Sequence, residues 1–223
     1  MRVIDGVHSV SVMPASYAFL VEGGGQLTLI DTGPRAGAKK ILQAIESLGF
    51  AAEIVKQIVV THYHHDHVSG VEELVERTNA QVLVHAADAP AVRGEEEPLS
   101  GGMLRPLIGR TTHAHASFRV DGELQDGDVI RPGGLQVIHT PGHTAGHISL
   151  YLPSARALFT GDAVFNVLGL RGPPFFFNRD SAQAKESIRK FAALECDAVC
   201  FAHGAPLTEN ATARLRAFIS HLG

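Results

Sequence analysis

The stretch IVVTHYHHDHVSG, residues 58–70, joins the pattern of a buried strand to a dense group of histidines. Its first three residues are β-branched and apolar, which is typical of a short buried strand. In an extended chain His62 and His64 point to one side and can bind one metal ion, whereas on a helix they would lie about 200° apart. The chain then turns, so that Asp66 and His67 face a neighbouring position. The stretch therefore predicts a metal site that two ions can share.

Residues that can bind a metal also follow three later apolar runs. His143 lies in TPGHTAGH after LQVIHT, Asp162 lies in TGD after ALFT, and His203 lies in HGAP after AVCFA. Each is next to a glycine, where the backbone can turn sharply and expose a side chain. If these strand ends share one edge of the fold, five His and two Asp meet there, enough for three private ligands per ion and one shared carboxylate. Imidazole and carboxylate together suit zinc, with iron or manganese as alternatives.

Short apolar or alternating runs predict nine strands, and amphipathic runs with start signals predict four helices. The strands are expected near 7–12, 17–21, 27–30, 57–61, 81–85, 135–139, 147–152, 157–160 and 198–202. The helices are expected after Pro34, from a capping box formed by Ser69 and Glu72, after Asp180, and from Thr208. Because the helices fall early, in the middle and late among the strands, they predict an α/β fold in which helices cover sheets.

The chain has 223 residues, 45% of them hydrophobic and 19% charged, which suits a folded domain with a sizeable core. No linker rich in Pro, Gly or Ser divides it, so we predict a single domain over 1–223. Residues 86–120, with EEE and a Gly-Gly pair, are expected to form an irregular insertion. The two cysteines, Cys196 and Cys200, are expected to be small buried hydrophobic residues.

The charge balance argues against a nucleic-acid partner. Lysine and arginine total 19 against 23 aspartates and glutamates, and no run of five basic residues offers a phosphate-binding face. No stretch reaches the roughly 18 to 20 consecutive apolar residues that span a bilayer, and the first residues lack the pattern of a secretory signal. We therefore expect a cytoplasmic protein that acts on a small molecule and not at a membrane. The sequence does not indicate an oligomeric state.

The other histidines can be explained without a metal. Isolated histidines are usually core or surface residues, and we interpret four in this way: His8, His85, His139 and His221. His65 and His147 lie within the motifs at spacings that do not suit ligands, so we expect contact with solvent or hydrogen bonds around the site. His113 and His115 imitate a chelating pair, but no strand, acidic partner or glycine turn accompanies them, which favours a loop.

The order His-x-His-x-Asp-His, then Gly-His, Gly-Asp and His-Gly, resembles the metallo-β-lactamase fold superfamily, and most of all its small glyoxalase II-like hydrolases. The resemblance runs from Asp31 in IDTG to His203, most of the chain. It implies a four-layer αββα sandwich of two mixed sheets flanked by helices, with a dinuclear site between the sheet edges. It assigns His62, His64 and His143 to one metal, Asp66, His67 and His203 to the other, and Asp162 to both. Asp31 matches an aspartate that orients ligands by hydrogen bonding, although a turn-forming role in Asp-Thr-Gly would also explain it.

The resemblance implies a hydrolase with two Zn²⁺ ions. A metal-bound hydroxide would attack an ester, thioester or lactone carbonyl, while Asp66 helps to move the proton. Only 20 residues follow His203, too few for the helical domain that gives glyoxalase II its glutathione pocket. The loop after Asp162 is interpreted either as a substrate pocket or as an anchor that pins the loop to the core. The pocket candidates are Phe165, Arg171, Phe176 and Arg179.

Three other functions stay open. The first is a mononuclear iron dioxygenase acting on a persulfide, because relatives that resemble this scaffold bind one iron through two His and one Asp. The second is a phosphodiesterase of the same fold, although the charge balance does not support an RNA substrate. The third is a binding module without catalysis, against which the complete set of candidate ligands argues. Two equivalents of zinc would favour hydrolysis, whereas one iron with oxygen uptake would favour the dioxygenase.

Overall fold

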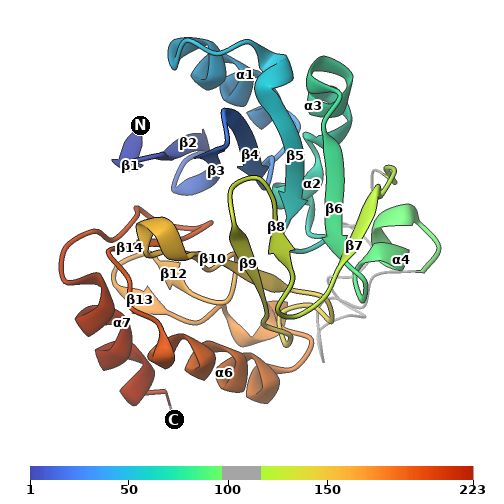
Figure 1. Cartoon of the computed structure of the whole chain (residues 1–223). Coiled ribbons are helices and arrows are strands. Elements are labelled where there is room, and N and C mark those ends of the chain that lie inside the picture. Colours follow the sequence, from blue (N-terminus) through green and yellow to red (C-terminus); the bar gives the residue numbers. More distant parts are fainter. Residues whose placement is uncertain (97–116, 223) are drawn as a thin grey trace.

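Four layers of secondary structure stack upon one another in the computed structural model, which describes residues 1–96 and 117–222 (Figure 1). Two sheets lie face to face, and helices cover the outer face of each. Both sheets contain parallel and antiparallel pairs, so the prediction of an αββα sandwich with two mixed sheets is confirmed. Of the insertion predicted at 86–120, residues 97–116 lie outside the described residues. His113 and His115 are among them, so the prediction for this pair also falls outside.

The first sheet has seven strands in the order of the sequence. They are β1 (Arg2–Ile4), β2 (Val7–Met13), β3 (Ser16–Gly23), β4 (Gln26–Ile30), β5 (Val55–Val60), β6 (Gln81–His85) and β7 (Gly122–Leu124). The pairs from β1 to β4 are antiparallel, and those from β4 to β7 are parallel. Parallel neighbours end at the same edge of a sheet, so β4 and β5 bring Asp31 and the 61–67 segment together.

The second sheet has five strands in the order β14-β11-β10-β9-β8. They are β8 (Val129–Ile130), β9 (Leu135–His139), β10 (Ile148–Leu152), β11 (Ala157–Phe159) and β14 (Ala198–Cys200). A separate hairpin consists of β12 (Phe165–Asn166) and β13 (Leu170–Arg171). All nine predicted strands are present. The structure adds β1, β7, β8, β12 and β13, whose two or three residues are too short to show an alternating pattern.

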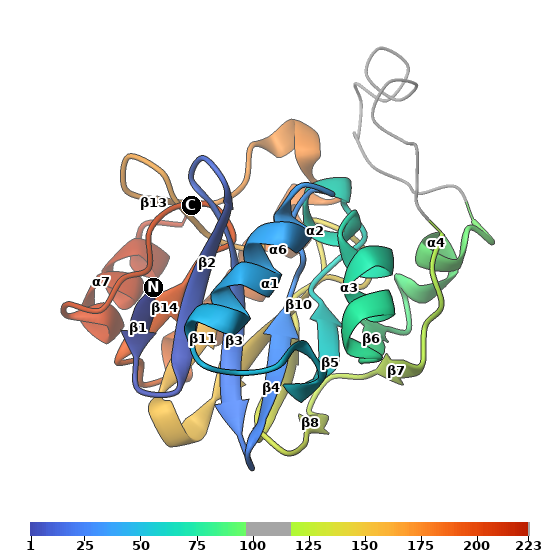
Figure 2. The ribbon, with the colours of Figure 1, turned by 90° about the horizontal axis from the view of Figure 1, so that it is seen from above.

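The helices lie on the two outer faces and at the edge where the metal-binding candidates lie. They are α1 (Gly37–Ser47), α2 (His65–Val68), α3 (Val71–Thr78), α4 (Ala89–Arg93), α6 (Ser181–Arg189) and α7 (Ala211–Ser220). Short 3-10 turns occupy Ala52–Ile54, Pro153–Ala155, Phe175–Phe177 and Lys190–Ala193. Figure 2 shows α1 and α3 in front of the first sheet, with α6 and α7 behind.

Three hydrophobic clusters fill the spaces between the four layers. On β5, Ile58 and Val60 face α1 and α3, whereas Val59 faces the second sheet. This alternation explains why the run of three β-branched residues is apolar throughout. Between the sheets, the rings of Phe19 and Phe159 pack edge to face with centroids 5.5 Å apart. A third cluster seals α6 and α7 against the second sheet, and Cys196 and Cys200 are free and buried in or beside it, as expected.

Two of the four predicted helix starts are wrong, whereas the helix expected after Pro34 is present as α1 and the start at Asp180 is confirmed. The Asp180 carboxylate accepts hydrogen bonds from the backbone N–H groups of Ala182 and Gln183 and thereby caps α6. Ser69 caps no helix: it is itself in helical conformation at the end of α2, and its hydroxyl donates to the His65 carbonyl instead. The last helix begins at Ala211 and not at Thr208, because the preceding residue has a left-handed backbone conformation.

Loops from both sheets meet at one edge of the sandwich. The Ile148 N–H at the start of β10 donates to the Thr61 carbonyl just beyond β5, at 2.9 Å. At a second point the Tyr17 N–H of β3 donates to the Ala202 carbonyl beyond β14, also at 2.9 Å. These two hydrogen bonds fix the position of one set of strand ends relative to the other. No helix in residues 1–96 and 117–222 is long and apolar enough to cross a membrane.

Candidate metal centre

The histidine-rich stretch changes from extended to helical in its middle. His62 and His64 lie in the extended part that follows β5, and the backbone of His64 is still extended. Asp66 and His67 lie on the short helix α2, which begins at His65. The turn therefore separates the stretch into two pairs, as its spacing predicts.

The second sheet supplies three more side chains from three separate loops. His143 follows β9, Asp162 follows β11 and His203 follows β14. Glycines beside them make the necessary turns: Gly142 and Gly204 have φ of 127° and 107°, in the left-handed region. A Cβ atom at Gly204 would lie 2.2 Å from the Asn166 carbonyl oxygen, so only glycine allows this approach.

The structure brings all seven predicted ligands together. The ligand atoms of the first group lie within 4.8 Å of one another, and so do those of the second. The first group comprises His62, His64, His143 and Asp162; the second comprises Asp66, His67 and His203. Each group takes side chains from loops of both sheets, so residues that are far apart in the sequence lie in the same group.

Asp162 lies between the two groups, and its two oxygens face different partners. Oδ2 is 3.4 Å from His143 Nε2 and 3.9 Å from His62 Nε2, on the first side. Oδ1 is 3.3 Å from both His67 Nε2 and His203 Nε2, on the second. The carboxylate thus presents one oxygen to each set of histidines.

The nitrogen and oxygen atoms that face this centre suit metal ions, because several of them are buried without a hydrogen-bond partner. Among the described residues, His62 Nε2, His67 Nε2 and Asp162 Oδ1 are buried and form no hydrogen bond. Leaving a buried polar atom unsatisfied costs about 1–3 kcal/mol, and all three atoms converge on the same space. His64 Nδ1 and His143 Nε2 are within hydrogen-bond distance of one another at 3.0 Å, so both nitrogens are directed at the same place. The side chains present therefore fit metal ions.

The electrostatics differ between the two groups. Burial is the largest effect on His62 and His64, and together with the neighbouring imidazoles it lowers their pKa values, so both are neutral. Burial acts the same way on His203, but Asp162 and Asp66 outweigh it and raise the pKa of His203 to about 9. The pKa of His67 is likewise raised, against the effect of burial, by Asp162 and Asp66. Neutral imidazoles can bind a metal directly, whereas the second pair must first release protons.

A family model described as the metallo-beta-lactamase superfamily matches residues 14–203, which include all seven side chains. The chain belongs to the metallo-beta-lactamase superfamily. Its relatives include the probable metallo-hydrolase YflN of Bacillus subtilis, 34% identical over an alignment of 227 positions that covers 91% of this chain and 85% of that protein.

Two other members of the superfamily inform the site. A hydroxyacylglutathione hydrolase of Cereibacter sphaeroides is 35% identical over 200 residues; the match covers 87% of this chain but only 65% of that protein. The crystal structure of TTHA1623 in a di-iron-bound form has a TM-score of 0.69 and 29% identity, over 95% of this chain and 99% of that one. The predicted resemblance to glyoxalase II-like members of the superfamily is confirmed.

Asp31, which the sequence analysis singled out, is hydrogen bonded to the centre. Its Oδ2 accepts from His67 Nδ1 at 2.9 Å and from the Thr61 hydroxyl at 2.8 Å, and its Oδ1 accepts from the Thr61 N–H. Because the Thr61 hydroxyl donates to Asp31, it is left to accept from His62 Nδ1, 3.1 Å away. Asp31 and Thr61 thus turn Nε2 of both rings toward the cluster, and Thr61 was missed by the sequence analysis.

His147 holds the backbone of Asp162 and is not part of either group. Its Nε2 accepts from the Asp162 N–H at 2.9 Å, so its Nδ1 carries the proton and donates to the Thr140 hydroxyl at 2.8 Å. Burial and the adjacent His143 lower the pKa of His147 to about 3, which keeps the ring neutral. A Cβ at Gly161, whose φ is 52°, would lie 2.7 Å from this ring. The expectation of hydrogen bonding around the site is met here.

Asn178 is a residue that the sequence analysis missed. Its Oδ1 lies 3.1 Å from His143 Nδ1 and accepts that proton, because its Nδ2 donates to the Ser181 hydroxyl. The neighbouring Arg179 N–H donates to the His143 carbonyl. An asparagine just before a helix start carries no signal of such a contact, which depends on how α6 packs against the His143 loop.

The candidate pocket residues differ in burial, and one of them contacts a candidate ligand. The half-buried Phe165 ring packs against the His203 ring, with centroids 4.7 Å apart. Phe176 is also half-buried, between the exposed Phe175 and Phe177, whereas Arg171 and Arg179 are exposed. These contacts allow a substrate-binding role for the loop and leave that role a prediction.

Among the described residues, the remaining histidines belong to neither group. His8 and His85 are buried, and the ring of His85 stacks on that of His139 with centroids 4.0 Å apart. His65 and His221 are exposed. These positions agree with core and surface roles.

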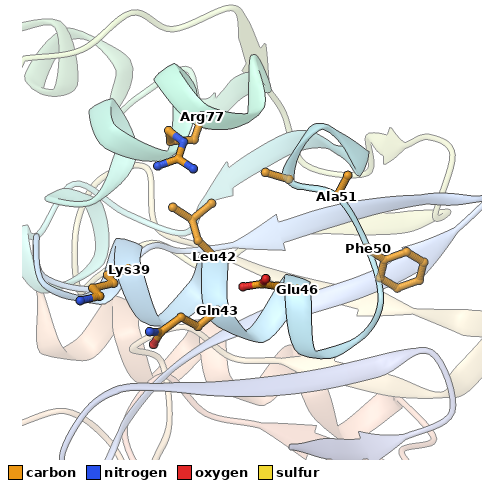
Figure 3. Close-up of a pocket in the computed structure, with 8 residues that line it drawn as sticks. Lys39, Leu42, Gln43, Glu46, Phe50, Ala51 and Arg77 are labelled. Atoms are coloured by element: carbon orange, nitrogen blue, oxygen red, sulfur yellow. The ribbon is translucent and has the colours of Figure 1, made fainter.

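A groove of about 450 Å³ lies between α1, α3 and the turn that follows α1 (Figure 3). Leu42 and Phe50 contribute apolar surface to it, and Lys39, Glu46 and Arg77 line it with charge. These residues belong to the outer helical layer, whereas the candidate ligands follow the strand ends. The groove therefore contributes nothing to the metal centre.

Proposed function

We propose that this member of the metallo-beta-lactamase superfamily is a dinuclear metal-dependent hydrolase that cleaves an ester, thioester or lactone bond. The observation that carries the proposal is the position of Asp162, with one oxygen toward each group of histidines. A carboxylate in this position can bridge two ions about 3.5–4 Å apart, the separation found in two-metal hydrolases.

Under this proposal each ion has three ligands of its own and shares Asp162. The two sets are His62, His64 and His143 for one ion, and Asp66, His67 and His203 for the other. Imidazole and carboxylate ligands favour Zn²⁺, and iron or manganese would also fit. The di-iron form of the related TTHA1623 supports a two-ion centre.

The bound ions would supply a nucleophile at neutral pH by lowering the pKa of coordinated water. Asp66 is proposed to hold the proton that this releases. Its side chain is 42% exposed, against 6% for Asp162, and its Oδ2 lies 3.3 Å from His203 Nε2. Burial opposes its ionisation, but His67 and the hydrogen bond from His203 prevail and keep the pKa of Asp66 well below its usual value. The carboxylate is therefore ionised, which is the state in which it can accept a proton.

The substrate is proposed to be a small molecule, and a thioester is favoured by the hydroxyacylglutathione hydrolases among the relatives. Because the chain spans about two thirds of their length, their substrate is not assumed. Phe165 and Phe176 would contact an apolar part of the substrate, and Arg171 and Arg179 an anionic part. The absence of a nucleic-acid or membrane partner and the cytoplasmic location stay predictions.

Metal analysis and a substrate panel test the proposal. Protein purified without chelators should contain two equivalents of zinc, iron or manganese and should hydrolyse one of the thioesters, esters or lactones. One equivalent of iron, with oxygen uptake on a persulfide, would replace it with the dioxygenase. Turnover of phosphodiesters alone would indicate the second alternative, and a loaded protein inert on every substrate would indicate a binding module.

A further inference from the structure

Asp88 is a buried carboxylate that the proposed reaction does not use. It is 1% exposed and occupies the N-cap position of α4. An aspartate at this position ordinarily accepts the backbone N–H groups of the first helical turn, but its side chain makes no such bond here. The side chain is turned away from the helix that it begins.

The Asp88 carboxylate instead accepts hydrogen bonds from two segments that carry candidate ligands. Oδ2 accepts from the Thr144 hydroxyl at 2.7 Å, and Oδ1 accepts from the Gly146 N–H at 2.6 Å. The backbone of Tyr63 also bonds to the carboxylate. Tyr63 lies between His62 and His64, and Thr144 follows His143, so one side chain joins both segments.

The approach of the two backbones is as close as glycine allows. A Cβ at Gly146 would lie 2.5 Å from the Asp88 backbone nitrogen and 2.7 Å from its Cγ. The loop is therefore pressed directly against Asp88, with no room for a side chain between them. Because the contact leaves no slack, a shift of Asp88 would move the neighbouring candidate ligands as well.

A carboxylate makes these contacts with two accepting oxygens. In an asparagine one of them is an NH₂ group, which would either face the Gly146 N–H donor or reverse the bond with the Thr144 hydroxyl. Burial of the charge is unfavourable and raises the pKa of Asp88 to about 6. A neutral residue would avoid this cost, so the contribution of Asp88 lies in the bonds that it accepts.

We propose that Asp88 is a positioning residue that holds the His62–His64 segment and the His143 loop at the separation that the first metal ion requires. The separation at issue is that of His64 Nδ1 and His143 Nε2, which are 3.0 Å apart. The inference rests on the proposed function in one respect, because it takes these histidines as ligands. Asp88 itself belongs to neither group of candidate ligands.

The test compares Asp88→Asn and Asp88→Ala with Ser187→Ala. The Ser187 hydroxyl donates to the Pro141 carbonyl at 2.7 Å, so its loss loosens the same loop without separating the two segments. Each protein is stripped and titrated with Co²⁺, and the affinity of each site is measured by competition with a chromophoric chelator. Both Asp88 variants should bind the first ion about 10–100-fold more weakly, with an altered Co²⁺ absorption spectrum. The second ion and the Ser187→Ala protein should be unaffected.

A merely structural role for Asp88 would lower the unfolding midpoint and leave the Co²⁺ spectrum and both affinities as in the parent protein, which would overturn the inference. If neither Asp88 variant folds, Thr144→Val removes one of the bonds with little change in volume. It should weaken the first site alone, and an unchanged first site in that variant would also overturn the inference. A parent protein that binds no Co²⁺ would instead refute the proposed function.

Discussion

Asp162 carries one carboxylate into a space that four imidazoles share, and its replacement should remove the link between two ions. We expect Asp162→Ala to lose at least one metal equivalent and all measurable turnover, because both groups lose a ligand atom. Elemental analysis and assay on the best substrate of the panel measure this. Asp5→Ala, which removes a carboxylate that is 97% exposed, is the matched control. An active Asp162→Ala protein with its full metal content would contradict the bridging role.

Asn178 should tune the affinity for metal without binding it. Asn178→Ala leaves His143 Nδ1 without its acceptor, so the ring can rotate, and we expect a 10–100-fold loss of affinity at the first site. Asn178→Asp keeps an accepting oxygen and should restore most of the affinity. Ser181→Ala, which affects only the other end of the amide, should bind metal like the parent protein. Equal affinities in all four proteins would show that the contact does not orient His143.

Asp88 also makes the stability depend on pH. Burial raises its pKa from 3.8 to about 6, so between these values the folded protein binds more protons than the unfolded chain. The contribution of Asp88 to the free energy of unfolding is therefore fully present below pH 4. It is lost as the pH rises through about 6, by up to about 3 kcal/mol. Asparagine does not titrate in this range. The free energy of unfolding of Asp88→Asn, minus that of the parent protein, should therefore increase by this amount between pH 4 and 7. Parallel pH profiles for the two proteins would disprove the shift.

The seven candidate ligands could be predicted from the sequence, but most of the residues that hold them could not. The ligands follow strands at recognisable spacings, and glycines mark the turns beside them. Thr61, Asp88 and Asn178 each form a hydrogen bond with a partner 30 to 58 positions away in the chain, besides nearer contacts such as that of Thr61 with His62. No local pattern encodes a contact over such a separation, and each of these residue types is common in loops for other reasons.

At the scale of single elements, two helix starts that look alike in sequence should respond differently to mutation. Asp180 caps α6 through two N–H groups, so Asp180→Ala should lower the free energy of unfolding by about 1 kcal/mol. Ser69 caps no N-terminus, and Ser69→Ala, at a half-buried position, should change the free energy of unfolding by less than about 0.5 kcal/mol. Chemical denaturation of the metal-free proteins measures both. A larger effect at Ser69 than at Asp180 would contradict the assignment of the caps.

The reason for the difference lies in the residues before each helix. Asp180 has extended backbone angles, which leave its carboxylate free to reach the first turn of α6. Ser69 ends α2 in a helical conformation and lies one residue before the N-cap of α3. The sequence pattern of a capping box is the same in both cases, but α2 was not predicted because its four residues are too few to show helical periodicity.

At the scale of the whole molecule, the layers were expected but the order of the strands was not. The number and spacing of apolar runs indicate helices packed on sheets, and the resemblance to a known family supplied the arrangement of four layers. Pairing is decided by contacts between distant segments, such as the parallel pair of β11 with β14 beyond the α6 region. That pair places His203 beside Asp162, which no property of either short strand predicts.

Metal removal should destabilise the entire fold, because each group takes ligands from loops of both sheets. Binding at a free concentration 100 times the dissociation constant adds about 2.7 kcal/mol per site, and each kcal/mol moves the midpoint by roughly 2–4 °C in a chain of this size. Thermal unfolding with chelator should therefore occur at least about 5 °C below that with excess Zn²⁺. Asp5→Ala should show the same difference, and Asp162→Ala a smaller one. If the parent protein unfolds at one temperature in both conditions, no ion joins the two sheets.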